Sequence, residues 1–386
     1  MTTAAERLLG SVRDLAPELV RRGSEIDEAR RLPPDLVDTL REIGLYRMLV
    51  PEELGGLEID YPASVDILTE LSAGDGATGW TTMIGCETPQ LVALLPRPTF
   101  DEFYADGPDT TIGGAFAPRG QAVVEDGGYR VSGRWGFASG CRHAEWLFGN
   151  CVVMRDGAPV MEESGAPRMR CAVLRADAWQ IHDTWYTAGL RGTGSHDISI
   201  EGAFVPEAWT FDLFGGEPTV PGPLFQAPLL QFSMHIGAVA LGIAEGAIRD
   251  LVDSVSGDRR RLYAKRDLAD SPTFQDLLGR AEADARAARA ALHAQAAEVW
   301  SQALAGKVDP GARTRVLQTD AWVAGTAARV VDACYTAGGG SALYESSPLQ
   351  RRLRDIHALT QHASLQGDVF VTAGAERLGR EGALVF

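Results

Sequence analysis

An aromatic-rich stretch, residues 133–146 (GRWGFASGCRHAEW), combines the residue types that hold a planar heteroaromatic ring. Trp135 and Phe137 offer flat apolar surface, and Ser139, directly after Ala138, offers a hydroxyl beside small residues. A planar cofactor needs a ring to pack on and a few hydrogen-bonding groups at its polar edge. The alternative is a strand whose aromatic side chains face a core, and composition alone leaves both interpretations open.

A second stretch, residues 189–206 (GLRGTGSHDISIEGAFVP), opens with three glycines, Thr193 and Ser195. Amides and hydroxyls of such a loop can approach a ligand closely. By itself the pattern is equally typical of a tight loop before a strand. Two such stretches in one β-rich region favour a binding site.

The third stretch, residues 356–365 (IHALTQHASL), places His357 and His362 five residues apart in a predicted helix. Ala363 follows His362 directly. Residues five apart on a helix point about 140° away from each other and do not easily share an ion. We therefore predict no metal site. The chain also has no HExxH, Walker, GxGxxG or nucleophile-elbow motif, which removes several common mechanisms.

Composition favours a soluble protein of the cytoplasm that binds neither nucleic acid nor membrane. The net charge of −16 repels nucleic acid and anionic lipid, and the longest apolar run, 236–248, is short and broken by Glu245. The N-terminus shows no secretory signal, and five cysteines without a CxxC pair fit reduced thiols. The basic run RRRLYAKR at 259–266 is either a solvated helix face or a phosphate clamp.

The secondary-structure elements that must position these residues fall into three zones. Together they predict a mainly α fold with a central β domain. Apolar residues at helical spacing predict helices before the β region and after it, whereas short alternating runs and Asp126-Gly127-Gly128 predict strands and a hairpin between them. Later helices are predicted from Pro272, over about 311–336, and after Pro348. The predicted domains are 1–109 (helical), 110–211 (β) and 212–386 (a helical bundle).

Five segments carry a resemblance to a known family. They read LVPEELGGLEIDY, GYRVSGRWGFASG, GLRGTGSHDISIEGAFVP, SPTFQDLLGRAEA and AGGGSALYESSPLQRRLRDIHA, in that order. The chain resembles the acyl-CoA dehydrogenase superfamily from about residue 5 to 380. It is most similar to the two-component flavin-dependent monooxygenases, such as p-hydroxyphenylacetate hydroxylase, dibenzothiophene monooxygenase and the sugar nitrososynthases. The resemblance implies an N-terminal helical domain, a middle β-barrel-like domain and a C-terminal four-helix bundle.

The resemblance gives Ala363 a meaning. In acyl-CoA dehydrogenases the usual base is a glutamate about nine residues after the arginine of an Arg-Asp pair, and counting from Arg354 leads to Ala363. A methyl group abstracts no proton, so the dehydrogenase interpretation loses its base. Glu245 is a weaker substitute, since its neighbourhood is that of a surface glutamate.

The monooxygenase relatives imply the cofactor and its contacts. Reduced FMN or FAD would come from a separate flavin reductase and react with molecular oxygen to a C4a-hydroperoxide, which transfers one oxygen atom. By resemblance, Ser139 reaches the flavin N5, and Trp135, Phe137 and Ala138 lie along the ring. His362 would tune protonation of the oxygen intermediate or of a substrate hydroxyl; His357 is equally typical of a helix surface.

Further contacts follow by resemblance alone. Arg261 matches an arginine on the flavin phosphate, and Gly338 and Gly339 match a loop that reaches the flavin of a neighbouring subunit, which implies a homotetramer. The Ala-rich helix at 274–304 agrees with a subunit interface, although an intramolecular bundle explains it equally well.

The substrate is expected to be a neutral aromatic or polycyclic molecule. By resemblance, the pocket is lined by Trp80, Met83, Cys86 and His235, a largely apolar set. Aromatic hydroxylation is the favoured reaction; N- or S-oxygenation and an acyl-CoA dehydrogenase-type desaturation are alternatives. A catalytically silent binding subunit is a further alternative, which failure to bind any flavin would support.

Overall fold

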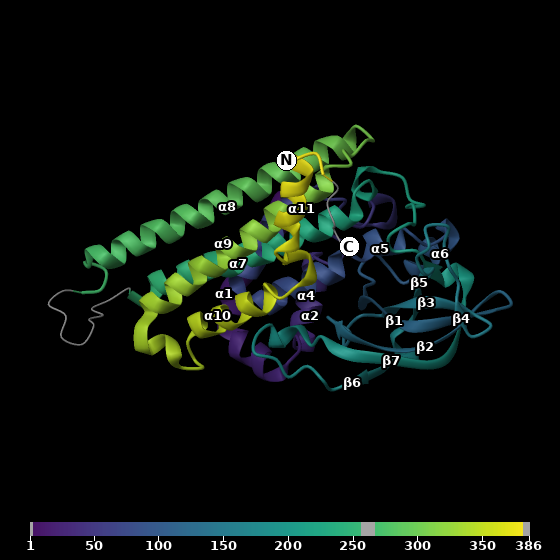
Figure 1. The fold of residues 1–386 in the computed structure, drawn as a ribbon. Coiled ribbons are helices and arrows are strands. Elements are labelled where there is room, and N and C mark those ends of the chain that lie inside the picture. Colours follow the sequence, from purple (N-terminus) through teal and green to yellow (C-terminus); the bar gives the residue numbers. More distant parts are fainter. Residues whose placement is uncertain (1–2, 256–266, 381–386) are drawn as a thin grey trace.

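The chain forms a layer of helices packed beside a β-sheet, and Figure 1 shows the long helices on one side of the molecule and the strands on the other, with the short helices α5 and α6 beside the strands. The computed structural model describes residues 3–255 and 267–380. Helices precede and follow the strands along the chain. The predicted mainly α fold with a central β part is thus confirmed.

The first helical segment reaches from residue 4 to residue 103. It contains α1 (Ala4–Ala29), α2 (Pro34–Ile43), α3 (Tyr61–Gly74), α4 (Gly76–Cys86), α5 (Thr88–Val92) and α6 (Arg97–Phe103). Local chemistry sets the start of α4, because the Asp75 side chain accepts the Thr78 backbone N–H at 2.7 Å and so caps the helix. The cap fixes the position of the residues that α4 carries.

One sheet contains all eight named strands. They are β1 (Ile112–Glu125), β2 (Gly128–Ala138), β3 (Trp146–Arg155), β4 (Ala158–Pro159), β5 (Met169–Arg175), β6 (Gln180–His182), β7 (His196–Pro206) and β8 (Thr210–Phe211). Their order is β6-β7-β2-β1-β3-β5-β8, with β4 beside β3. The predicted hairpin is confirmed, since β1 and β2 pair antiparallel up to Glu125 and Gly128. The path ends at β6 and β8, so the sheet is open rather than closed into a barrel.

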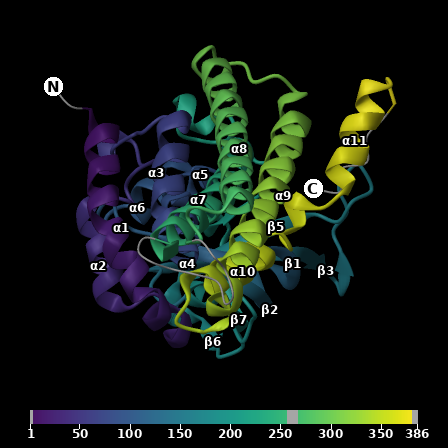
Figure 2. The same ribbon diagram turned by 90° about the vertical axis from the view of Figure 1, so that its left-hand side faces the viewer.

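The last segment supplies the long helices. They are α7 (Pro228–Val255), α8 (Pro272–Leu304), α9 (Ala312–Gly338), α10 (Pro348–Leu359) and α11 (Asp368–Arg377). Figure 2 shows α8 and α9 side by side, with α7 behind them. Leu229–Val255 is long and apolar enough to cross a membrane, but 78% of its most apolar window is buried, as expected of a core helix.

A buried arginine joins the two helical segments. Arg352 on α10 is 1% exposed, pairs with Asp250 at 3.0 Å, and donates to the carbonyl oxygens of Ser72, Ala73 and Gly74. These carbonyls end α3 and have no partner within the helix. A cation there also complements the negative end of the helix dipole. Arg352 therefore holds α10 against the start of α4.

Candidate active site

The end of β2 points two neighbouring aromatic residues in opposite directions. Trp135 pairs with Ile198 of β7 and Ala138 pairs with His196, so β2 has one extra residue between these positions. Such a bulge reverses which side chain faces the core. Trp135 is fully buried and donates to the Asn150 carbonyl at 2.7 Å.

The predicted contact between Trp135 and a cofactor therefore needs correction, because this indole lies in the interior of the β region and offers no surface to a ring. Phe137, by contrast, is 76% exposed and has a left-handed φ of 65°. Its ring meets the edge of Trp185 at 5.9 Å between centroids. Phe137 thus presents a flat apolar face on the surface.

Ser139 lies at the head of a chain of buried hydroxyls. The Trp80 indole N–H donates to Ser139 Oγ at 3.1 Å, and Ser139 Oγ lies 2.7 Å from Ser195 Oγ. Ser195 Oγ lies 2.6 Å from Thr193 Oγ1, which donates to the Leu190 carbonyl at 2.8 Å. Since the last hydroxyl must donate to a carbonyl, each earlier hydroxyl donates to the next.

This direction leaves one lone pair on Ser139 Oγ. Its hydrogen points to Ser195, and one lone pair receives the Trp80 N–H. The remaining lone pair can accept a hydrogen bond from a ligand. Ser139 is 6% exposed, so such a bond would form in a largely dry environment.

His362 faces the same tryptophan. Its ring meets Trp80 edge-on at 5.6 Å and Phe232 at 6.2 Å between centroids. Nδ1 lies 2.8 Å from Ser364 Oγ and accepts the Ser364 backbone N–H at 3.3 Å, so we assign both of these bonds to an accepting Nδ1 and the hydrogen of the neutral ring to Nε2. Burial lowers the pKa of His362 to about 4, which keeps the ring neutral at ordinary pH.

The predicted single helix with both histidines is wrong. α10 ends at Leu359, and His362 caps a separate 3-10 turn, η7 (Ala363–Leu365). The His362 ring accepts the Ser364 backbone N–H and so caps the start of η7, whereas α10 has its own C-cap at Thr360. His357 stays on α10, exposed, and contacts Asp332 at 2.8 Å.

Aromatic rings continue from His362 into the molecule. Phe232 of α7 meets Phe116 of β1 at 5.5 Å, and Phe116 meets Phe148 of β3 at 5.5 Å. Together with Trp80 they give α4, α7 and the sheet a common apolar, aromatic lining. Phe232 and Phe116 were missed in the sequence, because nothing local distinguishes them from core phenylalanines.

A buried acid holds the loop of the hydroxyl chain. Asp355 on α10 accepts the Leu190 backbone N–H at 2.7 Å. Burial, with the nearby Asp75, raises the pKa of Asp355 to about 7. Asp355 of the Arg-Asp pair therefore positions the loop that ends in Ser195, while Arg352, three residues earlier on α10, holds this helix against the end of α3.

Three predicted substrate contacts lie in the interior. Met83, Cys86 and His235 have no exposed surface, and Cys86 Sγ contacts the Met83 carbonyl. His235 lies between Ser64, at 2.8 Å from Nε2, and the carboxylate of Glu87. Of the predicted lining, the side chain of Trp80 meets Ser139 directly, whereas these three are packed against protein.

The remaining predicted residues lie elsewhere. Gly338 is the last residue of α9 and Gly339 the first of the 3-10 turn η6 (Gly339–Leu343), which leads toward α10. Arg261 and the basic run 259–266 lie outside the described residues. Glu245 is bound to the Arg289 guanidinium at 2.8 and 2.9 Å, which does not suit a free base.

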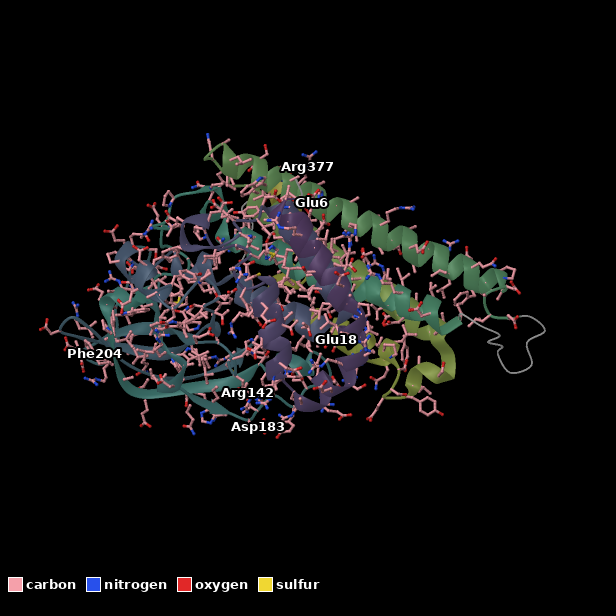
Figure 3. All side chains as sticks on the ribbon, turned by 180° about the vertical axis from the view of Figure 1, so that it is seen from behind. Glu6, Glu18, Arg142, Asp183, Phe204 and Arg377 are labelled. Carbon is pink, nitrogen blue, oxygen red and sulfur yellow. The ribbon has the colours of Figure 1, made fainter. Side chains whose placement is uncertain are left out.

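The surface beside Phe137 is charged. Asp183 is held by Arg30 at 2.7 Å, and this pair lowers the pKa of Asp183. Figure 3 shows Arg142 and Asp183 near each other where the sheet meets the N-terminal helices. Among residues 3–255 and 267–380, no group of three His, Cys, Asp or Glu side chains is arranged to hold a metal ion.

Two family models match the chain. The acyl-CoA dehydrogenase N-terminal domain matches residues 2–94, and the acyl-CoA dehydrogenase C-terminal domain matches residues 234–367. The two matches cover the helical segments on either side of the sheet.

Curated relatives and solved structures match nearly the whole chain. Indole-3-acetate monooxygenase of Pseudomonas putida is 35% identical over 98% of this chain and 94% of its own. The flavin-dependent monooxygenase oxygenase subunit HsaA of Mycobacterium tuberculosis is 31% identical over 93% and 92%. The structure of XiaF from Streptomyces sp. in complex with FADH2 has a TM-score of 0.90 and 25% identity, over 98% of this chain and 97% of that one.

Proposed function

Because the chain belongs to the acyl-CoA dehydrogenase superfamily, in its branch of flavin-dependent monooxygenase oxygenase subunits, we propose that it hydroxylates a neutral aromatic or polycyclic molecule. It would use reduced FMN or FAD from a separate flavin reductase, with molecular oxygen as co-substrate. Bound reduced flavin would supply the activation of oxygen.

The observation that carries this proposal is the free lone pair of Ser139. Reduced flavin carries a hydrogen on N5, whereas oxidised flavin has an acceptor there. The hydroxyl chain from Trp80 to Leu190 leaves Ser139 Oγ able to accept, so it suits the reduced form. An oxygen that holds the N5 proton also hinders early loss of peroxide.

The residues around Ser139 fit a flavin ring. Phe137 is 76% exposed, so its flat aromatic face is open to a planar ring. Ala138 follows it with no bulk to obstruct a ring. We therefore assign Phe137, Ala138 and Ser139 to the cofactor, and leave Trp135 to the core.

His362 is proposed to act on the oxygen that is transferred or on the substrate hydroxyl. Its neutral ring can donate from Nε2, and its place beside Trp80 puts it near Ser139. A neutral donor in a dry site stabilises developing negative charge on oxygen without supplying an acidic proton that would release peroxide.

The aromatic lining supports an aromatic substrate. Trp80, Phe232 and Phe116 offer edges and faces for ring contacts, which suit a planar apolar molecule. Relatives are named for indole-3-acetate and resorcinol, both aromatic. N- or S-oxygenation remains the second candidate, because the same activated oxygen would serve it.

Desaturation of an acyl-CoA is not supported by the site. Ala363 is exposed at the start of η7 and has no carboxylate, and Glu245 is neutralised by Arg289. The binding of reduced flavin separates a catalytically silent subunit from an oxygenase, because a subunit that binds no flavin can do no oxygenase chemistry.

We also propose a cytoplasmic homotetramer that binds neither membrane nor nucleic acid. Large apolar side chains are exposed on and near the last helices: Leu343, Tyr344, Phe370, Val371 and Leu378. Such surfaces suit contacts between subunits. Gly338 and Gly339 would then reach the flavin of a neighbour.

The test is anaerobic binding of reduced FMN or FAD, followed by rapid mixing with oxygenated buffer. A transient absorbance band, blue-shifted from that of oxidised flavin, would support oxygenase chemistry. Simple reoxidation, without such a band in the presence or absence of indole, would contradict it. Tight binding of oxidised FAD that a fatty acyl-CoA reduces would instead identify a dehydrogenase, and no flavin binding would identify a silent subunit.

A further inference from the structure

We propose that a polar cluster between α4, α5 and α7 is a second subsite of the substrate pocket, which binds a neutral hydrogen-bonding group such as a phenolic hydroxyl or a ring N–H. The inner polar cluster consists of Glu87, Gln90, Gln231 and His235. The inference rests on the proposed function, since it gives the substrate of that same site a second point of attachment.

The first observation is a buried pair with no net charge. The Ser64 hydroxyl donates to the Tyr61 carbonyl at 2.9 Å, so His235 Nε2 donates to Ser64 Oγ at 2.8 Å. Nδ1 faces a Glu87 carboxylate oxygen, and one proton lies between them. Whether His235 or Glu87 holds that proton, the pair is neutral overall.

The second observation is a set of buried polar atoms without partners. Gln90 is 2% exposed and Gln231 is fully buried, yet neither the nitrogen nor the oxygen of either side-chain amide has a hydrogen-bond partner among the described residues. Glu87 Oε2 is unpaired in the same way. Unpaired buried polar groups are costly, so native proteins retain them where a ligand or water completes them.

The third observation is that these side chains share one place. Glu87 contacts His235, and the Ala93 carbonyl accepts the Thr219 backbone N–H at 2.7 Å, so the chain after Glu87 runs antiparallel to the chain that leads into α7. Gln90 lies between Glu87 and Ala93. Gln231 lies one turn before His235 on the same face of α7, on the part of the chain that runs back toward Thr219.

The cluster also lies on the path that leads from the reactive groups. Glu87 caps the C-terminal end of α4, seven residues after Trp80, which is two helical turns and about 10 Å along the axis. On α7, Phe232 precedes His235 by three residues and contacts the His362 ring. A molecule of two fused rings that contacts Trp80 and Phe232 can therefore reach the cluster with a substituent at its far end.

The chemistry of the cluster selects the substituent. The two amides offer donors and acceptors, and a free carboxylate oxygen accepts, so a hydroxyl or N–H finds a partner in either role. A carboxylate would enter a neutral environment beside Glu87 and lose its hydration without a matching charge from the cluster. The cluster thus favours neutral phenols and N-heterocycles over aromatic acids.

The test compares binding of matched probes to the flavin-free protein by equilibrium dialysis. The probes are 2-naphthol against 2-methoxynaphthalene, and indole against 1-methylindole. We expect the wild type to bind the parent of at least one pair about tenfold more tightly than its methylated partner, which blocks the donor. Gln231→Leu and Gln90→Leu should reduce this ratio to about one.

Gln295→Leu is the matched control. Gln295 is also a buried amide, 8% exposed with an unpaired Nε2, but it lies on α8 beside Thr319. Its removal should leave the ratio unchanged, and Gln231→Met replaces Gln231→Leu if the latter does not fold. Equal binding of parent and methylated probes by the wild type, as expected if only water completes the cluster, overturns the proposal. So does failure of all four probes to bind, or a ratio that both variants retain.

The outcome is independent of the flavin chemistry, because dialysis uses protein without flavin. Loss of the blue-shifted transient with an intact probe ratio would contradict the proposed function and leave the subsite in place. An intact transient with no probe preference would overturn the subsite alone.

Discussion

Two buried polar regions of this protein differ in how their hydrogen bonds are completed. At the junction of the sheet and the helices, the hydroxyls of Ser139, Ser195 and Thr193 are each bonded to a neighbour, in one direction. In the helical interior, the amides of Gln90 and Gln231 have no partner among the described residues. Both sets of side chains are buried, so exposure to solvent does not explain the difference.

The difference reflects what each region would hold. A complete chain fixes the orientation of Ser139 before any ligand arrives, which suits one atom of a constant cofactor. An incomplete cluster leaves atoms to be satisfied by a ligand, which suits a substrate. A third buried polar group, Asp320 of α9, serves as a comparison. We assign it no ligand, so its burial should only lower the stability of the folded protein.

Asp320→Asn should give the largest change, in stability. Burial raises the pKa of Asp320 to about 7 from 3.8, so the folded protein holds this proton more tightly than the unfolded chain. Stability is therefore lost as pH rises from about 4 to about 7, by at most about 4 kcal/mol. The asparagine variant lacks this loss, so its advantage over the wild type grows from pH 5 to pH 8. Urea denaturation midpoints at both pH values measure it.

Asp177→Asn, at an exposed position, is the control and should change neither midpoint by much. An Asp320→Asn variant whose advantage is the same at pH 5 and pH 8 would mean that the carboxyl is not protonated preferentially in the folded state. Asp320 would then resemble a ligand-completed group more than a structural one.

Ser139→Ala should give the next largest change, in the fraction of reduced flavin that is lost as peroxide instead of oxygenating the substrate. The variant loses the acceptor for the N5 hydrogen, so bound reduced flavin should release peroxide about 10- to 100-fold faster, while flavin binding persists through Phe137 and the loop. Peroxide formed per NADH consumed, with the reductase in excess, measures it. Ser132→Ala removes a hydroxyl from the same strand that accepts the Gly202 N–H, and should leave peroxide release unchanged. An unchanged rate in Ser139→Ala would remove Ser139 from the cofactor site.

Much of this architecture could be predicted from the sequence. The order of segments, the β1–β2 hairpin at Gly127 and the long C-terminal helices follow from local patterns of periodicity and turn residues. The pairing of the 133–146 stretch with the 189–206 loop in one binding region was predicted too. The structure brings Ser139 and Ser195 within 2.7 Å of each other.

What the sequence could not provide depends on contacts between distant segments. A single bulge decides that Trp135 points inward and Phe137 outward, and no local pattern marks it. α10 ends three residues before His362, and no glycine or proline in the sequence marks this end. The burial of His235 against Glu87 joins residues 148 positions apart, which no spacing rule relates.

Trp80→Phe should give a smaller change than Ser139→Ala. The phenyl ring keeps the apolar contact with His362 but removes the N–H that donates to Ser139. One neutral hydrogen bond is lost while the hydroxyl chain to Leu190 remains, so peroxide release should rise about fivefold. The double variant Trp80→Phe/Ser139→Ala should be no worse than Ser139→Ala alone, because both act through one oxygen. Additive effects in the double variant would show that Trp80 acts independently of the chain.

The smallest expected effect concerns His362. The product formed per flavin oxidised should show no break with pH that comes from this histidine. Burial lowers the pKa of His362 to about 4, so its ring stays neutral from pH 5.5 to pH 8, and product formed per flavin oxidised should not change with its titration. An ordinary histidine would titrate near pH 6.5 and give a break there. His357→Asn, at the exposed position on α10, should keep the wild-type profile, whereas His362→Asn should lower product yield equally at every pH. A break near pH 6.5 that disappears in His362→Asn would mean that the ring titrates during turnover, and that the interior beside Trp80 is wetter than the partnered hydroxyl chain implies.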